Sequence, residues 1–268
     1  MRRRELVEAR FRWTKEYLEA FEGEVRSYLD SKPYSVEVHV NRERTEYTFR
    51  IRIRESPPDH WPFVISDIVH NLRSTLDNLA FNLAGSPPGK RGESIQFPII
   101  HPGRKGGRPV FDKVAKRELA GVHPDAIAII EGVQPYHGLR GARPPYRSPG
   151  PWPPYILSVL NHMSNVDKHR SPHIGFFAAR EVAIRSAVPP VEFISHGGRF
   201  LEDKTVLARC RFAQPNVQVN RPSITHELAL KIPWRWGRYK TLPLADYLTW
   251  MVGLVERDIL TPLRPYMK

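Results

Sequence analysis

The chain has 268 residues, of which 41% are hydrophobic and 26% are charged, proportions typical of a globular protein with a sizeable core. No run approaches the roughly 18 apolar residues of a membrane span, and the N-terminal residues lack the apolar stretch of a secretory signal. A single cysteine, Cys210, excludes an internal disulfide. We therefore expect a cytoplasmic protein without a membrane partner.

The formal net charge of +13 is the strongest global feature of the chain. It favours an anionic partner, and RNA or single-stranded DNA is the usual candidate. An Arg-rich composition without any such partner is the alternative, because Arg clearly outnumbers Lys. The sequence supports the two explanations about equally.

The clearest helix signal lies at residues 65–83. Apolar residues recur there at the spacing of one helical face: Ile65, Ile68, Val69, Leu72, Leu76, Leu79, Ala80 and Leu83. The opposite face is polar and carries Ser66, His70, Arg73, Ser74 and Asp77, with a second polar row of Asn71, Asn78 and Asn82 beside it. We expect Leu72, Leu76 and Leu79 to be buried.

Two elements precede this helix: a first helix over residues 4–29 and a β-hairpin over 34–55 with its turn at 41–44. In the hairpin, Arg50, Arg52 and Arg54 alternate with apolar residues, so they are predicted to project from one face of one strand. Such a row suits a phosphate backbone. A solvated face of an antiparallel sheet is the alternative, and it is slightly favoured.

The remaining pattern predicts an α+β fold in a single domain of residues 1–268. An extended segment is expected at 95–100, helices at 110–119, 124–132, 155–169 and 244–260, and strands at 174–178, 182–187, 191–194, 206–212 and 224–232. The last helix is expected to end before Pro262. Residues 138–154, rich in Pro, Gly and Arg, are predicted to form a loop. The helical core would comprise 1–30, 60–170 and 241–268, and it would pack with one antiparallel sheet formed from 34–55 and 173–232.

Four segments carry a resemblance to a family of uncharacterised bacterial proteins. They are HNLRSTLDNL at 70–79, FPI at 97–99, QPY at 134–136 and NHMSNVDKHR at 161–170. The chain is also loosely similar to HEPN domains, helical bundles that include metal-independent ribonucleases with an Arg followed roughly four to six residues later by a His. Here Arg73 would pair with position 78, which is Asn78. A five-residue spacing also turns the two side chains about 140° apart on a regular helix.

The candidate site combines two polar helix segments that could face each other. His70, Arg73, Asp77 and His169 are the candidate catalytic residues, because histidine exchanges protons near neutral pH and arginine binds phosphate or carboxylate. The candidate binding residues are Asn78, Asn161, Lys168, Arg170, Arg50, Arg52 and Arg54. The alternative is structural: Arg73 and Asp77 would form an i,i+4 ion pair, and residues 167–170 would be a charged helix end.

Three functional hypotheses follow. The leading one is an intracellular RNA-binding or RNA-cleaving protein of HEPN-like type, acting in defence or stress response. The second is a protein that binds a small anionic ligand in a pocket between helices and sheet, with or without catalysis. The third is a structural or oligomerising protein without catalysis. We expect no cofactor or metal, because the sequence has no GxGxxG after a strand, no HExxH and no Cys/His pairing.

Overall fold

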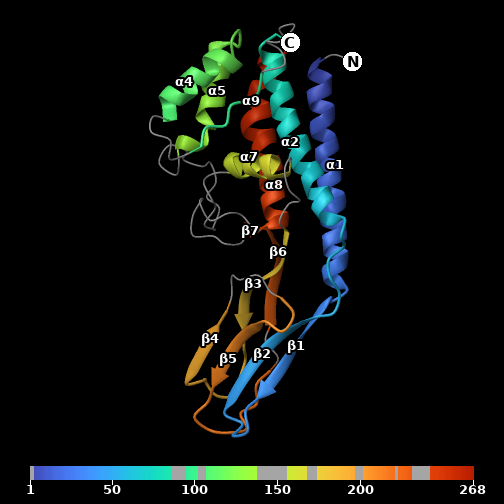
Figure 1. The fold of residues 1–268 in the computed structure, drawn as a ribbon, viewed down its shortest axis with the longest axis vertical. Coiled ribbons are helices and arrows are strands. Elements are labelled where there is room, and N and C mark those ends of the chain that lie inside the picture. Colours follow the sequence, from blue (N-terminus) through green and yellow to red (C-terminus); the bar gives the residue numbers. More distant parts are fainter. Residues whose placement is uncertain are drawn as a thin grey trace. The chain divides into compact units, whose positions relative to one another are not determined.

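The structure is a computed structural model that describes residues 3–85, 95–101, 107–137, 156–167, 174–196, 202–220, 223–230 and 242–268. The fold is α+β, as the sequence predicts. The chain divides into two compact units (Figure 1). The helical unit comprises Met1–Phe21, Phe63–Pro172 and Tyr247–Lys268, and the sheet unit comprises Glu22–Pro62 and His173–Asp246.

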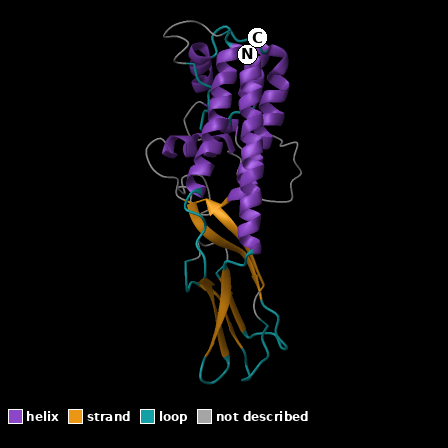
Figure 2. Cartoon of the chain, turned by 90° about the vertical axis from the view of Figure 1, so that its right-hand side faces the viewer, coloured by secondary structure: helices purple, strands orange, loops and turns teal. Residues whose placement is uncertain are grey.

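The helical segments Arg3–Asp30, Trp61–Leu83 and 244–263 run side by side in the helical unit (Figures 1 and 2). The helical elements, some of which extend past the unit's bounds, are α1 (Arg3–Asp30), α2 (Trp61–Leu83), α4 (Gly107–Glu118), α5 (Pro124–Gly132), η1 (Pro135–His137), α7 (Ile156–Asp167), α8 (Leu244–Leu254), η3 (Val255–Leu260), α9 (Thr261–Leu263) and η4 (Arg264–Tyr266). Ion pairs join α1 to the C-terminal helical segment, from Lys15 to Glu256 at 3.1 Å and from Arg264 to Glu8 at 2.9 Å.

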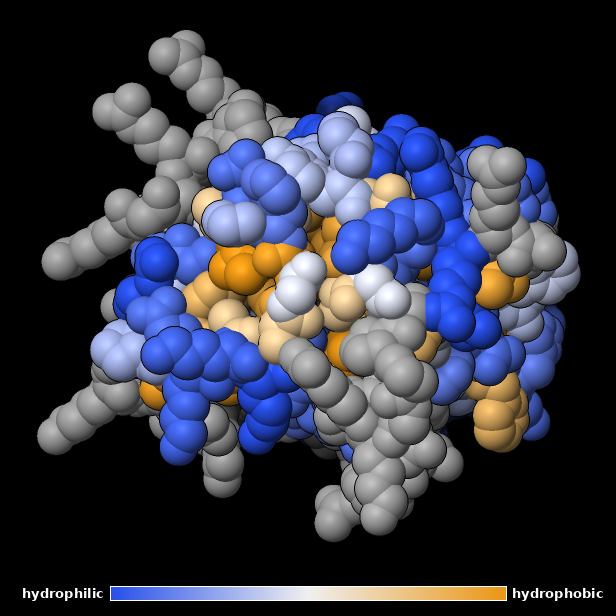
Figure 3. Space-filling view, turned by 90° about the horizontal axis from the view of Figure 1, so that it is seen from above, coloured by the Kyte–Doolittle hydropathy of each residue, from blue (hydrophilic) through white to orange (hydrophobic). Residues whose placement is uncertain are grey.

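The periodicity of α2 correctly predicts its core. Leu72, Leu76 and Leu79 are fully buried, and α2 begins at Trp61, a few residues before the predicted start. In the view from above, hydrophobic residues lie in the middle of this face and hydrophilic residues surround them (Figure 3).

Two residues of the polar rows predicted for this helix are buried rather than exposed. Ser66 is one, and Asn82 is the other, because its amide brackets the backbone N–H and carbonyl of Lys268 at 3.0 and 2.9 Å.

The prediction that the last helix ends before Pro262 is wrong. α8 continues into η3, a π-helical stretch, and then into α9, which contains Pro262 in its first turn. Proline lacks an N–H and its ring clashes with the preceding turn of an α-helix. The wider π turn, in which the Thr261 N–H bonds to the Glu256 carbonyl, immediately precedes this proline. The helical path therefore continues through the proline.

The described residues of the sheet unit form two antiparallel sheets rather than the single sheet expected. The first has the order β1-β2-β5-β4, from β1 (Tyr34–Val40), β2 (Glu46–Ile53), β5 (Val206–Arg211) and β4 (Glu192–Ser195). The second has the order β3-β6-β7, from β3 (Ile174–Ala183), β6 (Ser223–Leu230) and β7 (Leu242–Pro243). β3 covers the strand predicted at 174–178 but only the first two residues of the one predicted at 182–187, and its pairing with β6 shifts register twice.

Alternation in β2 places its apolar side chains in the interior. Phe49 and Ile51 are fully buried, and the buried Tyr47 hydroxyl donates to the Val217 carbonyl at 2.7 Å. Arg50 and Arg52 lie on the other face of the strand. β2 ends at Ile53, so Arg54 is not part of the strand, and the predicted row of three arginines is wrong at this position.

Candidate functional site

An extended segment, residues 95–101, is the feature around which the candidate site residues gather. It belongs to no strand, yet Ile95, Phe97 and Ile100 are buried. Buried backbone N–H and carbonyl groups need hydrogen-bond partners. Here side chains from α2, from α4 and from Gln134, which directly precedes η1, supply those partners.

Arg73 and Asp77 of α2 hold both backbone groups of Phe97. Arg73 Nη2 donates to the Phe97 carbonyl at 3.0 Å, and Asp77 Oδ1 accepts from the Phe97 N–H at 2.9 Å. The two side chains also form an i,i+4 ion pair, with Arg73 Nη2 and Asp77 Oδ1 2.8 Å apart. Burial lowers the pKa of Arg73, and the charge of Asp77 opposes this shift. The pair therefore forms hydrogen bonds with both backbone groups of Phe97, as a neighbouring β-strand would.

The side chain of Gln134 likewise forms hydrogen bonds with backbone groups further along the segment. Its side-chain oxygen accepts from the Ile100 N–H at 2.9 Å, and its amide nitrogen donates to the carbonyls of Pro98 and Ile130, also at 2.9 Å. At the start of the segment, Glu118 Oε2 accepts from the Gln96 N–H at 3.1 Å. The segments HNLRSTLDNL, FPI and QPY thus meet in one hydrogen-bonded arrangement.

Asn161 contacts the end of the same segment through His101. The Asn161 Nδ2 and His101 Nε2 atoms lie 3.1 Å apart, and His101 Nδ1 lies 3.0 Å from the hydroxyl of Ser158, which is buried. The series Ser158–His101–Asn161 has the residue types of a nucleophile and its base. A buried hydroxyl cannot reach a substrate, so these contacts dock α7 onto the segment.

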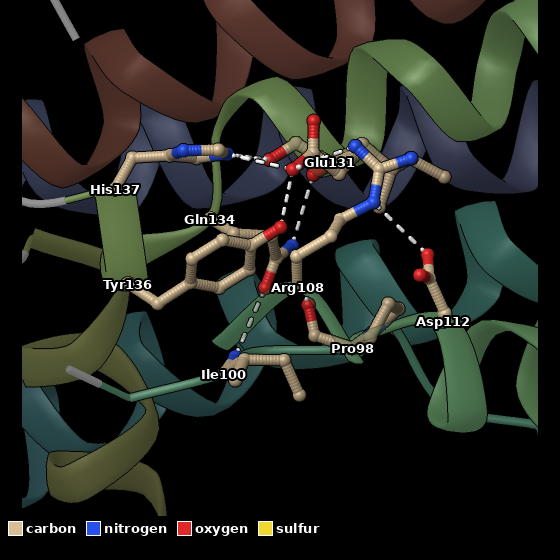
Figure 4. A network of polar contacts seen from close by, with 9 residues as sticks. Pro98, Ile100, Arg108, Asp112, Glu131, Gln134, Tyr136 and His137 are labelled. Carbon is tan, nitrogen blue, oxygen red and sulfur yellow. Dashed lines mark hydrogen bonds and ion pairs between the residues drawn. The ribbon is translucent and has the colours of Figure 1, made fainter. Parts of the chain in front are cut away.

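A second polar cluster surrounds Glu131 (Figure 4). Its carboxylate accepts from the Tyr136 hydroxyl, lies 2.9 Å from His137 Nε2 and lies 3.3 Å from Arg108 Nη1. Arg108 also pairs with Asp112 at 3.0 Å. Burial, followed by the hydrogen bond to Glu131, raises the pKa of Tyr136. The hydrogen bond to Asp112 is the main cause of the raised pKa of Arg108.

The Glu131 cluster can orient a base but is poorly suited to an anion. His137 Nε2 faces two acceptors, the Glu131 carboxylate and the Glu131 carbonyl at 3.0 Å, so this nitrogen carries the proton. A carboxylate that fixes the tautomer in this way resembles the arrangement of a general base. However, Arg108 faces two carboxylates, Asp112 and Glu131. A phosphate would be repelled rather than bound.

The structure describes three of the four predicted catalytic residues, and all three lie on α2. His70 is exposed, and its Nε2 lies 3.4 Å from the Ser74 hydroxyl. Arg73 and Asp77 are occupied with the Phe97 backbone, and Asn78 is half-buried. Lys168, His169 and Arg170 lie outside the described residues, so the expected meeting of the two polar helix segments is not visible.

The arginines of β2 lie on a sheet face that also carries carboxylates. Arg52 pairs with Asp203 at 2.7 Å, and Arg50 stands opposite Glu37 in the register of β1 and β2. On β5, Arg211 pairs with Glu192 of β4 at 3.2 Å. Arg52 and Arg211 are therefore paired with carboxylates, which favours the solvated-face interpretation at these two positions.

The positive charge of the chain is unevenly distributed. Among the described residues, Asp and Glu slightly outnumber Lys and Arg, although the whole chain carries +13. The basic excess therefore belongs to the segments outside them, chiefly 102–106, 138–155, 168–173 and 231–241. Within the described part of the chain, no group of three or more His, Cys, Asp or Glu residues could hold a metal ion. None of the described helices is long and apolar enough to cross a membrane.

Comparisons with protein-family models, with curated proteins and with solved structures give no match. Function must therefore be argued from the residues themselves. Sequence reasoning missed Gln134, Glu118 and Glu131 as members of the site. The available signal for Gln134 was a polar residue directly between apolar Val133 and Pro135, next to a proline that favours a turn.

Proposed function

We propose that the protein binds single-stranded RNA or DNA through basic, aromatic-rich segments. The distribution of charge carries this proposal. The segment 231–241, KIPWRWGRYKT, has four cationic residues, no acidic residue and three aromatic residues. Cations neutralise phosphates and aromatic rings stack on bases, which is the combination that binds single strands without strong sequence preference.

Neighbouring elements support the choice of this segment. Leu230 of β6 pairs with Leu242 of β7, so the two ends of 231–241 are held next to each other by the second sheet. The segment 138–155, between η1 and α7, has a similar composition, with Arg140, Arg143 and Arg147 among aromatic residues and no acid. Two segments of this kind in one chain supply several phosphate contacts.

The proposal is limited to binding, for reasons that lie in the described residues. Arg73 and Asp77 are committed to the backbone of Phe97, and the carboxylates around Arg108 oppose an anionic substrate. Asn78 stands where the loosely similar ribonucleases have His. These observations weaken the cleavage half of the RNA hypothesis and leave the binding half unaffected.

The experiment measures the affinity for a labelled oligouridine of about 20 nucleotides by fluorescence anisotropy, between about 50 and 200 mM salt. The test variant replaces Lys231, Arg235, Arg238 and Lys240 with Ala. Each lost phosphate contact lowers the slope of log K against log salt by about 0.7 for a single strand, so we expect a decrease of up to about 3.

The matched control loses the same charge from the first sheet and its flank. It replaces Arg52, Arg54, Arg209 and Arg211, all exposed, with Ala. We expect its salt slope to stay close to that of the wild type, because Arg52 and Arg211 are already paired with Asp203 and Glu192. Absence of binding at low salt would refute the proposal. Equal losses in the two variants would show that net charge alone, rather than these segments, determines affinity.

A further inference from the structure

Strand β1 forms an open edge of the first sheet. Its pairing within the described residues is with β2 alone, and residues 37–40 are exposed. Val38 and Val40 are 40% and 45% exposed, although their cross-strand neighbours Phe49 and Tyr47 are buried. An edge strand that leaves valines exposed is a site where another strand can add.

The hydrogen bonds at the two ends of the hairpin show which backbone groups are unused. The Asn41 N–H bonds to the Glu46 carbonyl at 3.0 Å, and the Arg54 N–H bonds to the Pro33 carbonyl at 2.7 Å. Antiparallel pairing alternates, so the odd-numbered residues of β1 direct their N–H and carbonyl groups to β2. The backbone groups of Val36, Val38 and Val40 therefore point to the open edge.

We propose that two copies of this chain associate by antiparallel pairing of β1 with β1, about a two-fold axis at Val38. Val38 then pairs with Val38 of the second copy, and Val36 pairs with Val40. The outward N–H and carbonyl groups of these residues meet in hydrogen-bonded pairs across the axis. The exposed valines of both copies lie on one face, where they cover each other. The interface is isologous, as two-fold symmetry requires.

Charge selects this register over its neighbours. With the axis at Val38, Glu37 of each copy stands opposite His39 of the other, in the closely spaced non-hydrogen-bonded position. A shift of the axis to Glu37 would place two carboxylates opposite each other, and a shift to His39 would pair two imidazoles. Glu37 and His39 are half-exposed and lie 3.8 Å apart within one strand, with Arg50 and Thr48 as their neighbours on β2. The sequence VEVHV at 36–40 is thus complementary to itself.

Sedimentation equilibrium of the full chain without nucleic acid tests the proposal. We expect a reversible dimer at about 100 µM, in the range of moderate affinities. His39→Glu places carboxylates opposite each other in two symmetric positions and should weaken the dimer about tenfold. Glu37→His should also weaken it. The exchange variant Glu37→His with His39→Glu recreates both acid–imidazole pairs, so it should recover the wild-type dissociation constant within about threefold.

Hydrogen exchange provides a second measurement that folding defects cannot imitate. The amides of Val36, Val38 and Val40 should exchange more slowly as the protein concentration rises, whereas those of Glu37 and His39, which already face β2, should change little. A monomeric wild type at about 100 µM would overturn the proposal. So would a His39→Glu variant that dimerises like the wild type, or an exchange variant that fails to recover. These outcomes do not depend on nucleic-acid binding.

Discussion

Replacement of Asp77 by Leu tests whether the Arg73–Asp77 pair stabilises the helical unit. The change leaves the Arg73 guanidinium, whose side chain is 11% exposed, without its carboxylate, and it removes the acceptor of the Phe97 N–H. Breaking a buried pair costs about 3 to 5 kcal/mol. Because the Asp77 side chain is 30% exposed, water can partly replace it, and we expect the low end, about 3 kcal/mol.

The chain contains a matched control on α4. Arg108 and Asp112 form the same i,i+4 pair, but their side chains are 64% and 51% exposed. Asp112→Leu should therefore cost no more than about 0.5 kcal/mol. A double variant, Arg73→Met with Asp77→Leu, removes both charges and should be less destabilised than the sum of the single variants by about 2 kcal/mol.

The assay is urea unfolding combined with hydrogen exchange of the α2 amides, because two compact units need not unfold together. If Asp77→Leu lowered the free energy of unfolding by no more than about 0.5 kcal/mol, the Arg73–Asp77 pair would not stabilise the helical unit as argued. Additive single and double variants would show that the two side chains act independently.

Three further predictions follow from buried groups. Gln134→Ala should cost about 3 kcal/mol in urea unfolding, because it leaves the Ile100 N–H and the Pro98 carbonyl unpaired, while Gln96→Ala, at an exposed side chain, should have little effect. Leu76→Ala should cost about 2 to 5 kcal/mol, against about 0.5 kcal/mol or less for the exposed Phe63→Ala. Burial raises the pKa of Tyr28 to about 12. Its contribution to stability is therefore present below about pH 10 and lost as the pH rises through about 12, and Tyr28→Phe should show a smaller loss over this window by circular dichroism.

The sequence predicted local structure well wherever periodicity was strong. The apolar stripe of α2 identified Leu72, Leu76 and Leu79 as core, and alternation located the hairpin of β1 and β2. These periodic signals depend only on neighbouring residues within one helix or strand, so they can be recognised in the sequence without knowledge of the tertiary fold. They also sufficed for the α+β class.

Features that depend on distant partners were not predictable. Asn82 is buried because it brackets Lys268, 186 residues away. Gln134 is buried because it holds the backbone of a segment 34 residues upstream. Polarity argues for exposure at each position, and only the partner reverses that expectation. The error at Pro262 had a different cause: proline normally ends a helix, but here a π-helical turn directly before it allows the helical path to continue.

The position of the resembling motifs argues that they preserve a fold rather than a reaction. Arg73, Asp77 and Gln134 direct their polar atoms at backbone groups of residues 97–100, which have no strand partner. A catalytic group must keep an unused lone pair or proton for its substrate, whereas both polar atoms of the Gln134 side chain already bond to buried backbone groups. Arg73 uses Nη2 in this way and retains one buried nitrogen, Nη1, without a hydrogen-bond partner among the described residues. The charge excess, in contrast, lies outside the described residues. Stability and nucleic-acid binding should therefore respond to different variants: Asp77→Leu should lower stability without changing the salt slope, and the four-residue variant of 231–241 should do the reverse.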